Sequence, residues 1–223
     1  MNNIGTQWTG DQILALTWQD LAPYYRELNN VDLTPDTLES WLDAWSNLLK
    51  IERELEHRRY IAPTRNTADA AATQAFEAFL NEIQVQYRTA NQTLTEKLLQ
   101  SQLEPAGFHL TLHQLRTQAA LFNKQNLALL NAQALLAAEY DRNTGSQTVE
   151  WDGSEKTVAE LQPYYLAADR GVREAAWRLS FERQFADREA LNHLWARLID
   201  RRHRIAVNTG LPTFRDYRWL ELT

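Results

Sequence analysis

Cysteine is absent from all 223 residues of the chain. Without thiols there is no disulfide, no cysteine nucleophile and no thiolate ligand for zinc. A chain free of cysteine fits a reducing compartment, so we expect a cytoplasmic protein. Residues 1–5 lack a basic segment followed by an apolar one, so no signal peptide is expected.

Glycine and proline are scarce, with 7 Gly and 6 Pro. Strand-rich folds use both residues in their tight turns, so the scarcity favours long helices. No apolar run approaches the ~20 residues that span a bilayer. The net charge of -6 argues against general nucleic-acid binding. We therefore expect neither a membrane nor a nucleic acid as a partner.

Apolar residues instead recur at helical spacing along most of the chain. Thr17 and Thr34 are candidate N-caps, and Pro35 fits the first helical position after Thr34. We expect the second helix to stop at Pro63, and the third to be continuous or broken near Asn91. The expected helices cover about 17–28, 34–60, 67–99, 111–122 and 126–140, with two more after residue 170.

One strand signal interrupts the helical pattern, at residues 147–158. Asp152-Gly153 between two strand-like runs predicts a tight hairpin turn. The expected fold is therefore all-α, a bundle of long helices with one small β-hairpin near residues 147–158. The break at Pro105-Ala106-Gly107 divides it into an N-terminal helical lobe, 1–105, and a second helical segment with the hairpin, 106–223.

Aromatic residues are frequent, with eight tryptophans. Several of them fall at helical spacing, so we interpret most of them as core. The stripe of Ala176, Trp177, Phe181 and Phe185 receives the same interpretation, because such spacing is more typical of packing than of a ligand platform.

Motifs of known catalytic chemistry are missing. None of the five histidines is followed by Glu, which excludes the H-E-x-x-H zinc helix. There is no G-x-S-x-G and no glycine-rich phosphate loop. The 29 acidic residues single out no acid–base pair. We therefore expect no catalytic residue, no cofactor-binding residue and no metal ligand in this chain.

His109 and His113 lie four residues apart and could share one helical face, as zinc ligands do. A zinc site needs at least a third ligand, and the nearby Glu104 precedes the break at Pro105. We prefer the simpler interpretation, which is two histidines on a helix close to a loop.

Arginine is concentrated near residue 200, where Arg197, Arg201 and Arg204 share a helical face with Asp200 interleaved. An anion site and an ion-paired surface are both possible, and the ion-paired surface is preferred because acidic residues dominate elsewhere. The same choice and the same preference apply to a second charged group, made of Arg170, Arg173 and Glu174.

Five segments of the sequence, taken together and in order, carry a resemblance to a known family. They are residues 16–25 (LTWQDLAPYY), 41–48 (WLDAWSNL), 148–153 (TVEWDG), 173–178 (REAAWR), and 205–210 (IAVNTG) with 215–217 (RDY). Together they resemble the oligoendopeptidase F group of the thimet-oligopeptidase-like zinc metallopeptidases. The resemblance stays in register over essentially the whole chain.

In that family the H-E-x-x-H helix and the third zinc ligand lie further downstream. The resemblance therefore implies a parent enzyme that hydrolyses short peptides with zinc-activated water and a Glu base. It implies that this chain is one helical wall of the substrate channel, restricting entry to flexible peptides. Alone the chain is expected to be inactive; zinc, the downstream catalytic domain and short peptides belong to the full-length enzyme.

A stand-alone helical binding or scaffold module is the alternative. The last ten residues, 214–223, are aromatic and charged and have no polar fade-out, so we expect a chain cut inside a larger fold. More aromatic surface follows Gly171 than one end of a bundle readily buries. We expect apolar side chains to be exposed near residues 212–223, with marginal stability, self-association or a frayed end.

Overall fold

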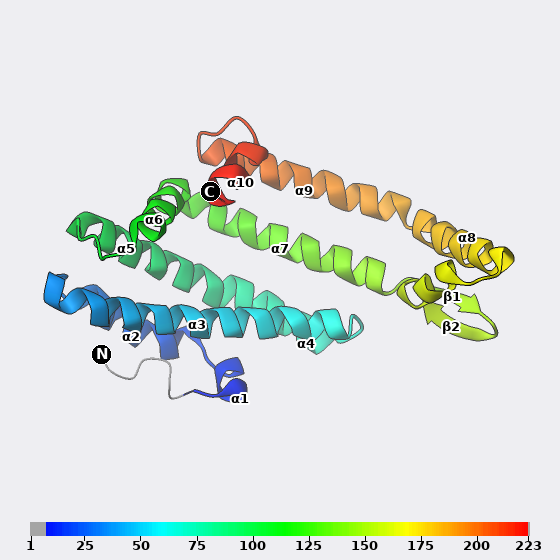
Figure 1. Ribbon diagram of the computed structural model, residues 1–223, viewed down its shortest axis with the longest axis horizontal. Coiled ribbons are helices and arrows are strands. Elements are labelled where there is room, and N and C mark those ends of the chain that lie inside the picture. The colour runs from blue at the N-terminus through cyan, green and yellow to red at the C-terminus, as the bar shows by residue number, and fades with distance from the viewer. Residues whose placement is uncertain (1–7, 223) are drawn as a thin grey trace.

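The computed structural model describes residues 8–222. Residues 1–5, where no signal peptide is expected, and Thr223 lie outside the described residues. Long helices dominate and lie roughly alongside one another, and two short strands form a hairpin at one end (Figure 1). The expected all-α fold with one small hairpin is confirmed.

The regular elements described in the first half of the chain are all helices. They are α1 (Gly10–Leu14), α2 (Trp18–Asn30), α3 (Pro35–Arg65), α4 (Ala70–Ala78), the π-helical turn η1 (Phe79–Gln84) and α5 (Val85–Ser101). Thr17 and Thr34 are the N-caps of α2 and α3, as predicted. The Thr17 N–H donates to the Asp20 carboxylate at 2.8 Å, which satisfies a backbone group that the helix cannot.

Three of the predicted start, stop and break positions are wrong. Pro63 does not stop α3, which continues to Arg65, because in the last turn a proline removes only one backbone hydrogen bond from a helix already ending. Asp69, and not Thr67, caps the next helix, since its carboxylate accepts from the Ala72 N–H at 2.9 Å. The chain does not break at Asn91; the irregularity is the π-helical turn η1.

The second half contains α6 (His109–Leu121), α7 (Lys124–Gly145), β1 (Thr148–Trp151), β2 (Ser154–Thr157), the 3₁₀ segment η2 (Ala159–Leu166), α8 (Arg170–Ala186), α9 (Arg188–Asn208) and α10 (Phe214–Leu222). The strands are antiparallel, with Trp151 opposite Ser154. Asp152 and Gly153 have φ of 49° and 70°, the left-handed backbone that a two-residue hairpin turn requires. In Figure 1, α9 lies along α7, and α10 folds back beside it.

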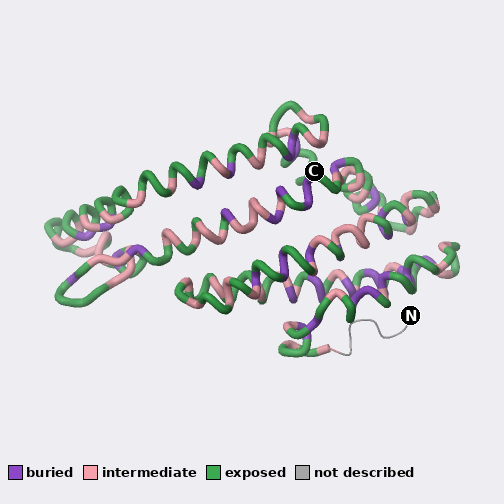
Figure 2. The backbone as a smooth tube through the Cα atoms, turned by 180° about the vertical axis from the view of Figure 1, so that it is seen from behind, coloured by how far each residue is buried: buried purple, intermediate pink, exposed green. Residues whose placement is uncertain are grey.

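The main hydrophobic core lies among α2, α3, η1 and α5. Trp41, Phe79 and Leu98 are at most 1% exposed there. The buried clusters among the described residues of the second half are small, and most of α8 and α9 is exposed (Figure 2). The proposed division near residue 105 stays a prediction. No described helix is both long and apolar enough to span a bilayer.

Candidate functional site

A cleft of about 690 Å³ opens between α3, α5 and α6, and we call it the α3–α5 cleft. Its apolar wall and its polar wall come from different parts of these helices. The lining residues are Leu42, Trp45, Ser46, Leu49, Glu52, Arg53, Glu56, Tyr87, Arg88, Asn91, Thr95, Phe108, Thr111, Leu115 and Gln118.

A buried carboxyl group lines this cleft. Glu52 is 3% exposed. The side-chain amide of Asn91 donates to it at 2.9 Å, and Tyr25 of α2 hydrogen-bonds its other oxygen. The Asn91 carbonyl oxygen in turn accepts from the Trp45 indole at 2.8 Å and from the Tyr25 hydroxyl at 3.0 Å. The four side chains therefore form one closed network that joins three helices.

Burial raises the pKa of Glu52 from 4.5 to about 8, because a charged carboxylate is poorly solvated there. The Asn91 hydrogen bond opposes the rise, and the neighbouring Glu56 adds to it. Glu52 is therefore mostly protonated at neutral pH. A protonated Glu52 can donate to Tyr25, which then donates to Asn91, so the network is satisfied without a buried charge.

Glu56, one turn further along α3, is a second carboxylate in the cleft. It accepts from the Gln84 amide at 2.9 Å and from the Tyr87 hydroxyl at 3.0 Å. Burial, followed by the Glu56 charge, raises the pKa of Tyr87 well above its usual range, so Tyr87 remains a donor. Both carboxyl groups are thus already engaged by neutral donors.

Two arginine side chains also border this cleft. Arg53 and Arg88 have no hydrogen-bond or ion-pair partner among residues 8–222. Since Glu52 is mostly protonated at neutral pH, the two guanidinium groups give this end of the cleft a net positive charge.

His109 and His113 lie on the exposed side of α6, one turn apart. In the described part of the chain, no three His, Cys, Asp or Glu side chains are grouped so as to hold a metal ion. The residues present therefore do not fit a zinc site.

The arginine face of α9 is ion-paired, as preferred from the sequence. Arg197 contacts Glu139 of α7 at 3.1 Å, and Asp200 lies 3.0 Å from Arg201 and 3.9 Å from Arg204. In the second group, Arg173 donates to the backbone carbonyl groups of Ala167 and Ala168, and Glu174 pairs with Arg178. Arg170 makes none of these contacts.

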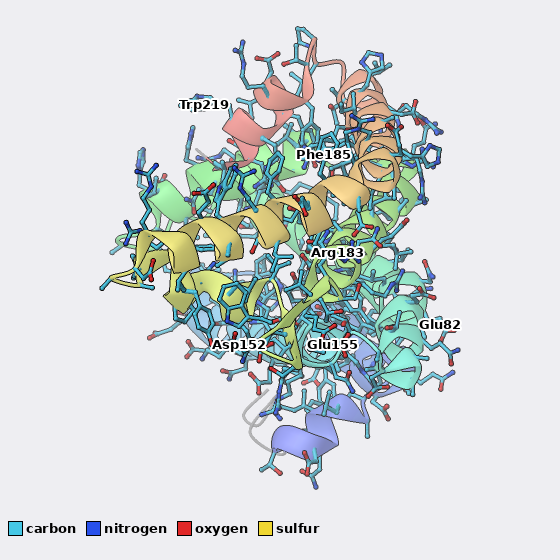
Figure 3. The ribbon with its side chains drawn as sticks, turned by 90° about the vertical axis from the view of Figure 1, so that its right-hand side faces the viewer. Glu82, Asp152, Glu155, Arg183, Phe185 and Trp219 are labelled. Atoms are coloured by element: carbon cyan, nitrogen blue, oxygen red, sulfur yellow. The ribbon has the colours of Figure 1, made fainter. Side chains whose placement is uncertain are left out.

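The interpretation of most tryptophans as core is wrong for the C-terminal helices. Trp41, Trp45 and Trp151 are buried, but Trp177 is 55% exposed. Phe181 and Phe185 are equally open and stack with it in a row along α8, with ring centroids 5.4 and 5.9 Å apart. Figure 3 faces this end of the molecule, where Phe185 lies at the surface. The helical spacing correctly predicted that these side chains share one face of the helix. It did not predict whether other elements cover that face.

The expected exposure of apolar side chains near the C-terminal end is confirmed. Leu220 and Leu222 of α10 are 39% and 69% exposed. On α9, the large apolar side chains Trp195, Ile199 and Val207 are open as well. Exposed apolar surface therefore runs along α8, α9 and α10, and we call the row Trp177, Phe181 and Phe185 the α8 aromatic row.

Comparison with solved structures places this geometry among known folds. PZ peptidase A, solved with an inhibitor, superimposes with a TM-score of 0.78 at 19% identity. This chain has the fold of part of a PZ peptidase or an oligoendopeptidase F. A provisionally named oligoendopeptidase F gives a TM-score of 0.74 at 19% identity. Another, from Bacillus anthracis, gives 0.75 at 15%.

The superpositions cover nearly all of this chain but much less of each solved structure. PZ peptidase A aligns with 96% of this chain, but this chain spans only 38% of PZ peptidase A. The Bacillus anthracis oligoendopeptidase F gives 92% and 39%. This coverage is consistent with a chain that corresponds to the N-terminal part of such a fold. No protein-family model matches the chain, and no curated protein matches its sequence significantly.

Proposed function

We propose that this chain is a non-catalytic helical region of a zinc metallopeptidase that acts on oligopeptides. The observation that carries the proposal is the superposition of nearly the whole chain on 38% of PZ peptidase A. The lack of a fitting metal site among residues 8–222 agrees with a role outside the catalytic centre. Zinc and the peptide-cleaving residues would then belong to another part of the full-length protein.

Within such an enzyme the chain would form one wall of the substrate channel. Long helices make a stiff wall that admits flexible peptides by shape. The α8 aromatic row supports this arrangement, because half-exposed side chains forfeit part of the roughly 1.5–3 kcal/mol that full burial of each would contribute. We propose that this row and the open side chains of α9 pack against the rest of the peptidase. The setting we propose is the cytoplasm.

The first test is activity of the chain alone. We expect no cleavage of quenched fluorescent oligopeptides, with or without added zinc. Turnover that copurifies with the chain and disappears on chelation would contradict the proposal. A variant with His109→Ala and His113→Ala serves as the control, because it removes the one histidine pair that shares a helix face.

A stand-alone helical binding or scaffold module is the second candidate. The observation in its favour is the main core, which buries Trp41, Phe79 and Leu98 without any partner. The genomic DNA beyond the codon for Thr223 separates the two. An H-E-x-x-H motif there, in frame or in a shifted frame, supports the peptidase region. A stop codon with no downstream remnant supports the module.

A further inference from the structure

We propose that the α3–α5 cleft is a binding site for a small amphiphilic carboxylate, whose apolar body lies at one end and whose carboxylate lies between Arg53 and Arg88. This inference goes beyond the proposed function and does not depend on it. A free fatty acid and the C-terminal residue of an apolar peptide share this chemistry.

The cleft changes character along α3. Leu42, Trp45 and Leu49 line it first, and Glu52, Arg53 and Glu56 follow. At ~1.5 Å of rise per residue, the apolar end and the charged end are separated by roughly 10 Å. A ligand with one apolar and one polar end matches this division.

The facing helix α5 contributes Tyr87, Arg88, Asn91 and Thr95 to the lining. Glu52 bonds Asn91, whereas Glu56 bonds Gln84 and Tyr87, so α5 runs antiparallel to α3. Arg88 therefore lies at the charged end. Phe108 and Leu115 of α6 add apolar surface to the lining.

The charged end selects an anion over a cation. Arg53 and Arg88 have no partner in the described chain, whereas both carboxyl groups already have donors. A guanidinium group matches a carboxylate with two parallel N–H···O bonds, and such charge-assisted bonds are stronger than neutral ones. A ligand carboxylate would thus supply what the two arginines lack.

The interior of the cleft also holds an unused hydrogen-bonding group. Thr95 is 6% exposed, and its hydroxyl has no hydrogen-bond partner among residues 8–222. Because Thr95 lines the cleft, this hydroxyl is available to a ligand or to solvent inside it. The volume of about 690 Å³ lies within the ~300–1,000 Å³ typical of small-molecule sites.

The experiment uses two carboxylate probes against the full chain by isothermal titration calorimetry. Octanoate stands for the free acid and is compared with 1-octanol. N-acetyl-Ala-Leu with a free carboxylate stands for the peptide terminus and is compared with its C-terminal amide. We expect one-to-one binding of at least one carboxylate, at least tenfold tighter than its uncharged counterpart. Which of the two binds identifies the source.

Arginine variants decide whether the cleft is responsible. Arg53→Gln and Arg88→Gln should each weaken carboxylate binding about tenfold or more. Arg116→Gln, on the exposed side of α6 and outside the cleft, is the matched control and should leave affinity unchanged. Circular dichroism verifies that each variant is folded. Failure of both carboxylates to bind, equal binding of the uncharged probes, or indifference to Arg53 and Arg88 would overturn the proposal.

Discussion

Asn91 on α5 donates its side-chain amide to the Glu52 carboxyl on α3 at 2.9 Å, and its oxygen accepts from Trp45 at 2.8 Å. One asparagine thus holds a buried acid and a buried indole on the same helix. Tyr25 of α2 contacts both Glu52 and Asn91, so α2, α3 and α5 are joined through polar groups inside an apolar core.

The first prediction concerns pH. Folding raises the pKa of Glu52 from 4.5 to about 8, so the folded chain holds this proton more tightly than the unfolded chain. Between about pH 5 and pH 8, rising pH should therefore lower the free energy of unfolding, by at most about 5 kcal/mol from this group. The loss levels off as the pH rises past the folded pKa of about 8.

Glu52→Gln isolates that contribution. Its amide imitates the protonated carboxyl, because it can donate to Tyr25 and accept from Asn91. Urea unfolding from pH 5 to 9 should show the wild type losing stability relative to Glu52→Gln as pH rises. The charged groups lining the cleft around Glu52 are Arg53, Glu56 and Arg88, and they are unchanged in both proteins. Parallel pH profiles would contradict the prediction.

The second prediction tests the network itself. Asn91→Ala leaves the Trp45 indole without its acceptor and removes a donor from Glu52. Losing a partner for buried polar groups costs roughly 1–3 kcal/mol each, so we expect a loss of about 2–4 kcal/mol in urea unfolding. Gln92→Ala, which removes only an exposed bond to Glu96, should change stability by less than about 0.5 kcal/mol. Equal effects of the two variants would argue against the network.

Local signals predicted much of the fold. Thr17, Thr34 and the Asp152-Gly153 turn act within a few residues of chain, so the sequence alone reveals them. The π-helical turn η1 has no such signal. The helix α10 was missed, although Thr213 and Asp216 form a capping pair, with the Asp216 N–H donating to the Thr213 hydroxyl at 3.2 Å.

The site was harder to predict because its partners are distant in sequence. Glu52 falls between Leu48 and Leu55 at helical spacing, which indicates a buried face and was available as a signal. Nothing local indicates that Asn91 lies opposite it. The α8 aromatic row shows a second limit of sequence reasoning. Helical spacing predicts that its side chains share one face, but it does not predict which other elements cover that face.

The third prediction concerns the link between α7 and α9. Asn126 is 1% exposed, donates to the Ile205 carbonyl at 3.1 Å and accepts from the Asn208 amide at 2.8 Å. Asn126→Ala should lower the free energy of unfolding by about 1–3 kcal/mol, because both partners lose a bond. The exposed neighbour Gln125 is the control, and Gln125→Ala should cost little. Thermal unfolding that does not separate the two variants would refute this.

The fourth prediction concerns the α8 aromatic row. Replacing Trp177, Phe181 and Phe185 together by Gln should reduce the fluorescence of bound 1-anilinonaphthalene-8-sulfonate, since the dye binds exposed apolar surface. Stability should change little, because these side chains are already about half exposed. A large loss of thermal stability would mean that the row is packed in solution, for example against a second copy of the chain.

The last prediction compares the protection of α10 with that of α3 by hydrogen exchange. In α10 only Tyr217 is buried, and the helix has 9 residues, fewer than the roughly 12–15 that an isolated helix needs for stability. Residues 38–55 of α3 contain Trp41, Leu48 and Leu55, all 0% exposed, so these amides should open only with global unfolding. We therefore expect amides of α10 to exchange at least tenfold faster than those of residues 38–55 in a dilute monomer.

Equal protection would mean that the packing of Tyr217 against α6 and α9 is sufficient to hold this end. The chain would then be a self-sufficient domain, and the stand-alone module would become the better functional assignment. Rapid exchange that slows when a covering partner is added would favour the peptidase region, because only that proposal requires a second surface over α8, α9 and α10.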